Sequence, residues 1–368
     1  MKVLVTGSDG FIGKNLCVRL LELKNIEVLK FNRSHSLVDL HNFIKQADFV
    51  FHLAGENRPK DENDFTTVNS ELTQQLCNLI RENNKNIPIA FTSSTQVKKS
   101  NPYGNSKLRA ETHLLNLHME TDVPIYIYRL PNVFGKWCKP NYNSVVATFC
   151  HNICYDLPII IDNPIIELNL VHVDTIINSF IDLLLNQQIE HIYIELDPIY
   201  KITLGELADY LYKFHNGHNS LLIERVGDGF IRTLYATYIS YMPTKSFSYP
   251  LTKHEDTRGC FVEMLKTKDS GQFSFLTAHP GVTRGGHYHH VKSEKFLVIK
   301  GKAKFGFRHI ITNEIFEIYT SGEHPEVIET IPGWSHDITN VGNDELIVIL
   351  WANEIFDKDH PDTVAHVV

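Results

Sequence analysis

The feature that most constrains this chain is a set of metal-ligating side chains at fixed spacing in the segment GVTRGGHYHHVKSEKFLVIKG, residues 281–301. His287 and His289 are two residues apart, and alternation along an extended strand puts both imidazoles on one face. Glu294 follows in the run that opens the next strand, and His336 comes later in IPGWSHDITN. Three imidazoles and one carboxylate suit zinc, and would also hold nickel, iron or manganese. We therefore predict a metal site made of these four residues.

The same segment resembles the first sequence motif of the cupin family, in which two glycines bracket a His-x-His pair and a glutamate. Gly281 and Gly301 fill the glycine positions. The second cupin motif is only partly kept, because Pro332, Gly333 and Asn340 accompany the histidine but no glycine stands where that motif begins. Short strands separated by glycine turns dominate this part of the chain and predict an all-β barrel. The alternative is a histidine-rich barrel rim without a metal.

Composition limits the class of protein. The chain has 368 residues, 43% of them hydrophobic, which is enough for two domains. A net charge of -8 and the lack of a basic run argue against a nucleic-acid partner. No stretch has the apolar length to span a membrane, and the first residues lead into a strand rather than a signal peptide. Six cysteines without a CxxC pair indicate reduced thiols, so we expect a cytoplasmic protein.

The beginning of the chain has the pattern of a dinucleotide-binding fold. Residues 2–6 (KVLVT) predict a buried parallel strand, followed by the glycine-rich TGSDGFIG and an amphipathic helix. In this order, glycines let the backbone approach a pyrophosphate, and the helix N-terminus supplies N–H donors. We predict an α/β Rossmann domain over residues 1–245. Its predicted cofactor contacts in this turn are Gly7, Gly10, Phe11, Ile12 and Gly13.

The second predicted strand, IEVLKFN, bears on the choice of cofactor. It leads into Asn32 and Arg33, where a fold that prefers NAD usually has a carboxylate for the ribose hydroxyls. No carboxylate is present, and Arg33 can pair with a 2′-phosphate, so we predict NADPH. The alternative is an ordinary solvated arginine. The next strand, DFVFHLAG, brings Leu53 and Ala54 to the predicted cofactor cleft.

A predicted catalytic group follows the strand IPIAFTSST. This strand delivers Ser94 to the carboxyl end of the sheet, where open α/β sheets bind ligands. Tyr103 and Lys107 lie four residues apart in a predicted helix and therefore share one face. A lysine beside the phenol lowers its pKa, so that the tyrosine can exchange a proton with a substrate oxygen. The alternative is a surface tyrosine and lysine on a solvated helix.

These segments, together with RLPNVFG at 129–135 and LVHVDT at 170–175, resemble the extended short-chain dehydrogenase/reductase family. The resemblance implies that Ser94, Tyr103 and Lys107 are catalytic. It also implies a substrate-side role for Asn132, His172 and Asp174. Dehydratases of this family need carboxyl groups directly after the active-site hydroxyl, whereas Thr95 and Gln96 stand here. An amide cannot shuttle protons, so we infer a reductase or oxidase.

A polar, loop-rich passage at about residues 240–256 separates the two patterns, and we expect a second domain over residues 246–368. The pairing of a reductase with a metal cupin resembles the CapF family of capsular polysaccharide enzymes. The resemblance implies that the barrel epimerises C3 of a UDP-2-acetamido-2,6-dideoxy-4-hexulose. The first domain then reduces the C4 ketone with NADPH. The implied product is UDP-N-acetyl-6-deoxytalosamine, a precursor of UDP-N-acetyl-L-fucosamine.

Several residues of the barrel are assigned roles on this basis. Lys295 follows the metal-binding glutamate and is predicted to polarise the C4 oxygen. The barrel also resembles metal-free dTDP-sugar 3,5-epimerases, in which the histidine matching His287 is the base. A metal-bound nitrogen cannot also take a proton, so His290 and His309 are candidate bases if Zn²⁺ is present. The candidate diphosphate ligands are Arg258, Arg284 and Arg308.

Two other functions fit the same residues. In one, only the reductase is active and the barrel is a dimerisation module that holds a structural zinc. In the other, the barrel is a metal-dependent oxygenase or isomerase for a small metabolite. We expect a homodimer, because cupins commonly associate through barrel strands.

Overall fold

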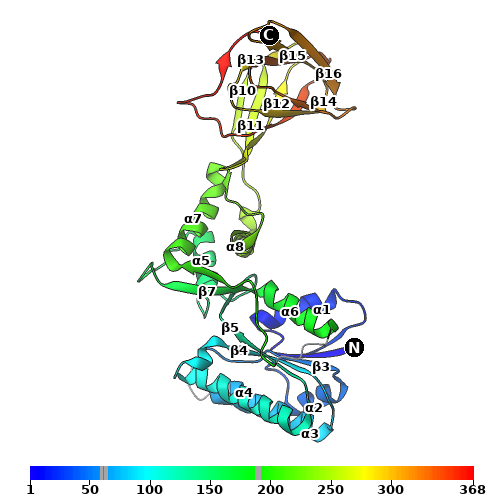
Figure 1. Cartoon of the computed structure of the whole chain (residues 1–368), viewed down its shortest axis with the longest axis vertical. Helices are drawn as coiled ribbons and strands as arrows, with labels where there is room; N and C mark the ends of the chain where they lie inside the picture. The colour runs from blue at the N-terminus through cyan, green and yellow to red at the C-terminus, as the bar shows by residue number, and fades with distance from the viewer. Residues whose placement is uncertain (59–60, 62–64, 187–191) are drawn as a thin grey trace. The chain divides into compact units, whose positions relative to one another are not determined.

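The computed structural model describes residues 1–58, 61, 65–186 and 192–368 (Figure 1). The chain forms two compact units, one of residues 1–211 and 232–243, the other of residues 212–231 and 244–368. The boundary expected between residues 245 and 246 lies close to the last of these crossings. Residues 212–231 group with the second unit, where β9 (Leu222–Ile223) pairs in parallel with β11 (Gly259–Thr267).

The first unit is built on a five-stranded parallel sheet in the order β2-β1-β3-β4-β5. Its strands are β1 (Lys2–Thr6), β2 (Glu27–Phe31), β3 (Phe49–His52), β4 (Ile89–Ser94) and β5 (Ile125–Leu130). Helices cover both faces, α1 and α6 on one side and α2, α3 and α4 on the other (Figure 1). The strands other than the edge strand β2 are therefore nearly continuous buried runs. Phe51 packs with Leu16 and Phe180 in one core, and Phe91 packs with Leu76 in the other.

Side-chain caps begin α2, α4 and α5, where Ser36, Asn101 and Ser144 each accept a backbone N–H group. For α4, the Asn101 side chain accepts a hydrogen bond of 2.7 Å from the Gly104 N–H, and Pro102 occupies the first helical position. The helices of the chain are α1 (Phe11–Leu21), α2 (Leu37–Gln46), α3 (Leu72–Asn83), α4 (Pro102–Thr121), α5 (Val145–Cys154), α6 (Val173–Asn186), α7 (Leu204–Ser220) and α8 (Gly229–Ile239), of which α7 and α8 have residues in both units. The short helical segments are Phe65–Glu71, Thr95–Lys98 and Thr244–Ser246. A small sheet contains β6 (Asn132–Phe134), β7 (Glu167–His172) and β8 (Tyr200–Thr203).

The second unit consists mainly of two β-sheets around one apolar core. One sheet has the order β10-β11-β12-β19-β14-β17, and the other has the order β16-β15-β18-β13-β20. Alternate residues point inward, so Phe296, Phe305 and Ile338 from different strands meet in the core. The further strands are β10 (Lys253–Asp256), β12 (Gly271–Ala278), β13 (Thr283–Tyr288), β14 (Glu294–Lys300), β15 (Lys302–His309), β16 (Ile315–Ser321), β17 (Val327–Glu329), β18 (Trp334–Asn340), β19 (Leu346–Ala352) and β20 (Val364–Ala365). The α/β and all-β architectures confirm the predicted fold classes.

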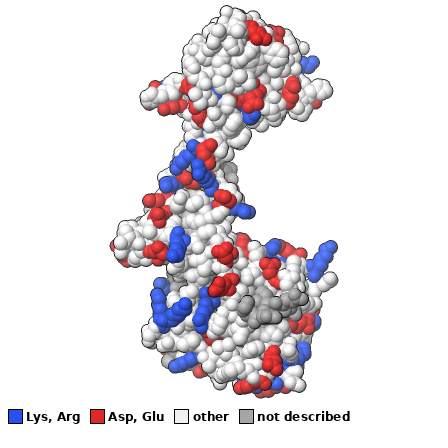
Figure 2. All heavy atoms as spheres, in the orientation of Figure 1, with Lys and Arg blue, Asp and Glu red and all other residues white. Residues whose placement is uncertain are grey.

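The surface is of mixed charge. Acidic and basic side chains are interspersed over the face drawn in Figure 2. Among the residues that the structure describes, no helix combines the length and apolar character needed to cross a lipid bilayer.

Candidate active sites of the two units

The turn between β1 and α1 depends on glycine. Gly7 has φ +70°, and a Cβ there would lie 2.7 Å from the backbone nitrogen of Ala54. A Cβ on Gly13 would lie 2.2 Å from the carbonyl oxygen of Gly7. Only glycine therefore lets α1 begin so close to this turn, at the carboxyl end of β1 where dinucleotide folds hold a pyrophosphate. The other predicted contacts in the same turn are Gly10, Phe11 and Ile12.

A buried network fixes the neighbouring strand end. The Thr6 hydroxyl accepts the backbone N–H groups of Leu53 and Ala54, each at 3.2 Å. His52 bridges Thr6 and Thr73 with hydrogen bonds of 2.8 Å on its two ring nitrogens. Burial lowers the pKa of His52 to about 3, so the imidazole is neutral. The network holds Leu53 and Ala54 beside the glycine turn, and their contact with a cofactor stays a prediction.

Arg33 lies just beyond β2 and forms an ion pair with Glu56, with Nη2 2.6 Å from Oε2. Its side chain is 85% exposed, so the guanidinium remains accessible to a ligand. Asn32 donates a hydrogen bond of 2.7 Å to Asp9 of the glycine turn. Burial alone would raise the pKa of Glu56, but hydrogen bonds from Tyr142 and two backbone N–H groups, together with Arg33, lower it. Glu56 was not predicted from the sequence and is a buried anion at this site.

The predicted catalytic residues Ser94, Tyr103 and Lys107 lie where β4 ends and α4 begins. Ser94 hydrogen-bonds Tyr103, and Lys107 lies one turn farther along α4. Burial raises the pKa of Tyr103, and the Ser94 hydrogen bond offsets part of this rise. The sequence argument expected Lys107 to lower this pKa, whereas the net shift is upward and burial is its main cause. Burial also lowers the pKa of Lys107 to about 8, against the opposing charge of Glu111. Its Nζ donates to the Thr92 carbonyl at 2.9 Å.

Asn69 is a buried residue of the site that sequence reasoning missed. Its side chain accepts the Glu56 N–H at 2.8 Å, and donates to the Glu56 carbonyl at 2.9 Å and to Ser106 Oγ at 3.0 Å. It thereby holds the loop after β3 against α4. Nothing in its polar surroundings, FTTVNSE, marks this role. The predicted substrate-side residues lie in β6, at the end of β7 and in the first turn of α6: Asn132, His172 and Asp174.

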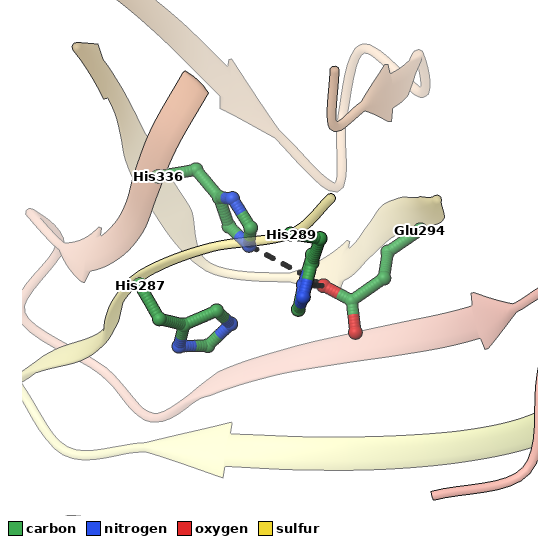
Figure 3. Close-up of side chains that lie close together, drawn as sticks. All are labelled: His287, His289, Glu294 and His336. Carbon is green, nitrogen blue, oxygen red and sulfur yellow. Dashed lines mark hydrogen bonds and ion pairs between the residues drawn. The ribbon is translucent and has the colours of Figure 1, made fainter. Parts of the chain in front are cut away.

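In the second unit, the four predicted metal ligands come together (Figure 3). His287 in β13 is opposite His336 in β18, His289 directly follows β13, and Glu294 opens β14. One ligand atom from each residue lies within 4.8 Å of the others. The Nε2 atoms of His289 and His336 are each 3.3 Å from Glu294 Oε2. The side chains point toward one another, as Figure 3 shows.

The chemical state of this cluster suits a divalent cation. Burial, reinforced by His336, lowers the pKa of His287 to about 4, so its imidazole is neutral. Burial would raise the pKa of Glu294, but its contacts with His289 and His336 and the charge of Lys292 lower it well below its usual value. Neutral imidazoles and an ionised carboxylate are the metal-binding forms. Among the described residues, Nδ1 of His336 is buried without a hydrogen-bond partner, and the Nε2 atom has only its 3.3 Å contact with Glu294 Oε2, which fits a side chain that serves as a metal ligand.

A cavity of about 380 Å³ opens onto the cluster. His287, Glu294 and His336 line it together with apolar side chains such as Phe261 and Phe296. A volume of this size suits a small organic ligand, and the apolar wall would exclude water around it. Two of the predicted diphosphate ligands, Arg258 and Arg284, line the cavity, whereas Arg308 is not among its lining residues.

The structure does not bring Lys295 to the cavity. Glu294 points inward at the start of β14, so the next residue points outward, and the exposed Lys295 pairs with Glu329 on β17 at 2.5 Å. Lys292 lies there instead. Its side chain is buried, lines the cavity and places Nζ 2.9 Å from Glu294 Oε1. This lysine replaces Lys295 as the candidate for binding a substrate oxygen.

The two candidate bases also lie away from the cavity. His290 is exposed, with its ring against Tyr288. His309 packs edge-on against Trp334, and its Nδ1 accepts backbone N–H groups of the following turn. Neither histidine lines the cavity, so neither is placed to remove a proton from a ligand within it.

Comparison with known proteins places these sites in a family. Residues 3–186 match the NAD dependent epimerase/dehydratase family, and residues 254–364 match the polysaccharide biosynthesis C-terminal domain. The crystal structure of the capsular polysaccharide assembling protein CapF from Staphylococcus aureus superimposes with a TM-score of 0.93 and 40% identity, covering 100% of both chains. The chain belongs to the CapF family. Membership in this family and the glycine turn together support a nicotinamide cofactor for the first unit.

Two further relatives define the extent of the similarity. The UDP-2-acetamido-2,6-beta-L-arabino-hexul-4-ose reductase of Pseudomonas aeruginosa is 55% identical over 365 residues, covering 99% of this chain and 98% of its own. The UDP-glucuronic acid 4-epimerase of Bacillus cereus, solved in complex with NAD, has a TM-score of 0.53 and 22% identity over 58% of this chain and 82% of its own. This second likeness shows a shared fold alone. The similarity to the Pseudomonas aeruginosa reductase therefore extends over both units, whereas the similarity to the Bacillus cereus epimerase covers 58% of the chain.

Proposed function

We propose that this chain is a bifunctional UDP-sugar enzyme of capsular polysaccharide precursor synthesis. The second unit epimerises C3 of a UDP-2-acetamido-2,6-dideoxy-4-hexulose. The first unit reduces the C4 ketone with NADPH to UDP-N-acetyl-6-deoxytalosamine, toward UDP-N-acetyl-L-fucosamine. The observation that carries the proposal is that each unit has its own site, a Ser–Tyr–Lys group in one and a cavity lined by metal-ligating residues in the other. The name of the 55% identical relative supports the reductase half.

The reductase site provides a proton where the ketone needs one. NADPH supplies the hydride for the ketone carbon and would be held by the glycine turn, Leu53, Ala54 and Arg33. Tyr103 gives its proton to the ketone oxygen as this oxygen becomes a hydroxyl. Ser94, which hydrogen-bonds Tyr103, orients the same oxygen. The Lys107 ammonium on the same helix face favours transfer of the phenolic proton.

In the barrel cavity, epimerisation is possible because the C4 ketone makes the hydrogen on C3 acidic. When a base in the cavity takes up the C3 proton, negative charge is left on the C4 oxygen, and Lys292 is placed to stabilise it. Zn²⁺ held by His287, His289, Glu294 and His336 would supply Lewis-acid polarisation. Return of a proton from the other face inverts C3. Reduction removes the ketone and with it this acidity, so epimerisation precedes reduction.

The proposal includes a homodimer formed through the barrel. On the outer face of one sheet, Phe275, Ile349, Leu297 and Val327 lie side by side across four strands. Two of them, Ile349 and Val327, are 40% and 59% exposed. A cross-strand row of apolar side chains can pair with the same row of a second copy, as an isologous dimer requires.

The proposal is tested by incubating the full chain with the UDP-4-keto sugar in heavy water without NADPH and following deuterium at C3. We expect incorporation that survives Tyr103→Phe and disappears in His289→Ala. With NADPH, Tyr103→Phe should block formation of the reduced sugar. These two variants separate the activities because each substitution affects only one site.

The same experiment decides between this proposal and a single reductase activity. If no deuterium enters C3 in the unsubstituted chain while reduction proceeds, the barrel is not an epimerase. The remaining role would be a structural-zinc dimerisation module, for which His289→Ala would disturb association instead of C3 chemistry. The cavity that opens onto the cluster favours the epimerase, because a structural site needs no space for a ligand.

A further inference from the structure

The segment that follows β19 passes back over the metal cluster. Within it, β20 pairs with β13, with Ala365 opposite His287 and Val364 opposite Tyr288. The His366 N–H donates to the Gly286 carbonyl at 2.9 Å. This segment therefore lies along the strand that carries the first predicted ligand, although the two are far apart in the sequence.

Asp362, just before β20, holds the turn that links two of the ligands. Its carboxylate accepts three consecutive backbone N–H groups, from His290 at 2.9 Å, Val291 at 2.7 Å and Lys292 at 2.8 Å. Three N–H groups on one carboxylate form a strong, charge-assisted arrangement. These three bonds tie the Asp362 side chain to the backbone of this turn. The turn they fix runs from His289 to Glu294.

The backbone of the same residue sets the protonation of a ligand. The Nδ1 atom of His289 hydrogen-bonds the Asp362 carbonyl oxygen. A carbonyl oxygen can only accept, so Nδ1 carries a proton, and this contact selects the neutral tautomer in which Nε2 has the lone pair. Nε2 is the atom that faces Glu294 at 3.3 Å. Metal-binding histidines commonly have this arrangement, in which an outer hydrogen bond fixes the tautomer and the ring orientation.

We propose that Asp362 is a positioning residue of the metal site, acting on His289 through its carbonyl oxygen and on the turn from His289 to Glu294 through its carboxylate. The carboxylate locks the turn, and the locked turn keeps the carbonyl against the imidazole. The same contacts aim Lys292 at the cavity. The inference rests on the proposed metal site and not on the proposed epimerisation.

The test is the affinity of the full chain for Zn²⁺, measured by competition with a chromophoric chelator. Loss of an outer-sphere partner typically costs about 10- to 100-fold in metal affinity, and we expect this loss in Asp362→Ala. Asp362→Asn keeps one oxygen and should lose less. The matched control is Asp359→Ala, which removes an exposed carboxylate of the same segment and should leave the affinity unchanged. Thermal unfolding of the metal-free variants shows whether the fold is kept.

A second readout separates positioning from general damage. Asp362→Ala should change the visible spectrum of the Co²⁺-substituted protein, because the His289 imidazole is no longer held in place. In a His289→Ala background, Asp362→Ala should lose most of its effect on affinity, since neighbouring residues that act through one another are not additive. If Asp362→Ala binds Zn²⁺ as tightly as the unsubstituted chain, or if the two losses simply add, the inference is wrong. If the unsubstituted chain binds no Zn²⁺, the metal site itself fails, and the first titration shows this separately.

Discussion

Two lysines, Lys292 and Lys295, give a matched test of the residues in the barrel cavity. Lys292 is buried against Glu294, whereas Lys295 is on the outer face of β14. Removing one group that stabilises a developing oxyanion typically costs about 100-fold in rate, so Lys292→Ala should slow deuterium exchange at C3 by this amount. Lys295→Ala should leave exchange unchanged. Equal rates in the two variants, measured by NMR, would contradict the role assigned to Lys292.

The buried Lys107 predicts the pH dependence of ketone reduction. Burial lowers its pKa to about 8, so the ammonium is present below this pH and is lost as the pH rises through it. Tyr103 then loses the positive charge that favours release of its proton, and kcat should fall above about pH 8. Lys107→Arg keeps a positive charge throughout this range and should remove the fall, whatever its absolute rate. A pH–rate profile that is flat from pH 7 to pH 10 in the unsubstituted chain would rule out this account.

At the residue scale, the spacing of residues in the sequence predicts the direction of a side chain only where the backbone is regular. His287, His289, Glu294 and His336 were found because strand alternation and fixed spacing bring them together. The same alternation should have placed Lys295 outside, since it directly follows the inward-pointing Glu294. Lys292 could not be placed, because it lies in a turn where alternation does not apply. Asp362 is about 70 residues from the turn it holds, and no local sequence pattern predicts that contact.

At the element scale, the end of β2 predicts the choice of nicotinamide cofactor. Arg33 is exposed and paired with Glu56, so a 2′-phosphate would bind the guanidinium in competition with that carboxylate. Loss of one such charged contact typically lowers binding affinity by about tenfold. Arg33→Ala should therefore raise the KM for NADPH by this factor, while the KM for NADH stays the same. The control is Lys30→Ala, an exposed cation within β2 itself. An equal change for both cofactors would contradict recognition of the 2′-phosphate.

Whole elements were easier to predict than their contacts. The strand, glycine turn and helix at the start of the chain follow from residue types alone, because only glycine fits where α1 meets the turn. The cap formed by Asn101 and Pro102 likewise predicts the start of α4. The pairing of β9 with β11 was not predictable, since a two-residue strand has no periodicity to read.

At the scale of the whole molecule, the outer sheet face predicts self-association. Ile349 is in the middle of the apolar row on β12, β19, β14 and β17. Ile349→Glu would bury a charge in a dimer interface, so the chain should elute as a monomer by light scattering while the unsubstituted chain elutes as a dimer. Exposed Glu326→Gln, close to the same face, is the control and should remain dimeric. If the unsubstituted chain were also a monomer, or if Ile349→Glu remained a dimer, this face of the barrel would not be the dimer interface.

The route of the backbone between the two units has a consequence for how the chain can be divided. The chain leaves the first unit after residue 211, returns at residue 232 and leaves again after residue 243. A fragment that starts at residue 246 would therefore lack β9, and Lys266 and Thr267 of β11 would lose their parallel neighbour. A single protease cut or gene fusion point cannot yield two intact halves. A fragment that keeps the pairing of β9 with β11 has to include residues 222 and 223 as well as the barrel strands.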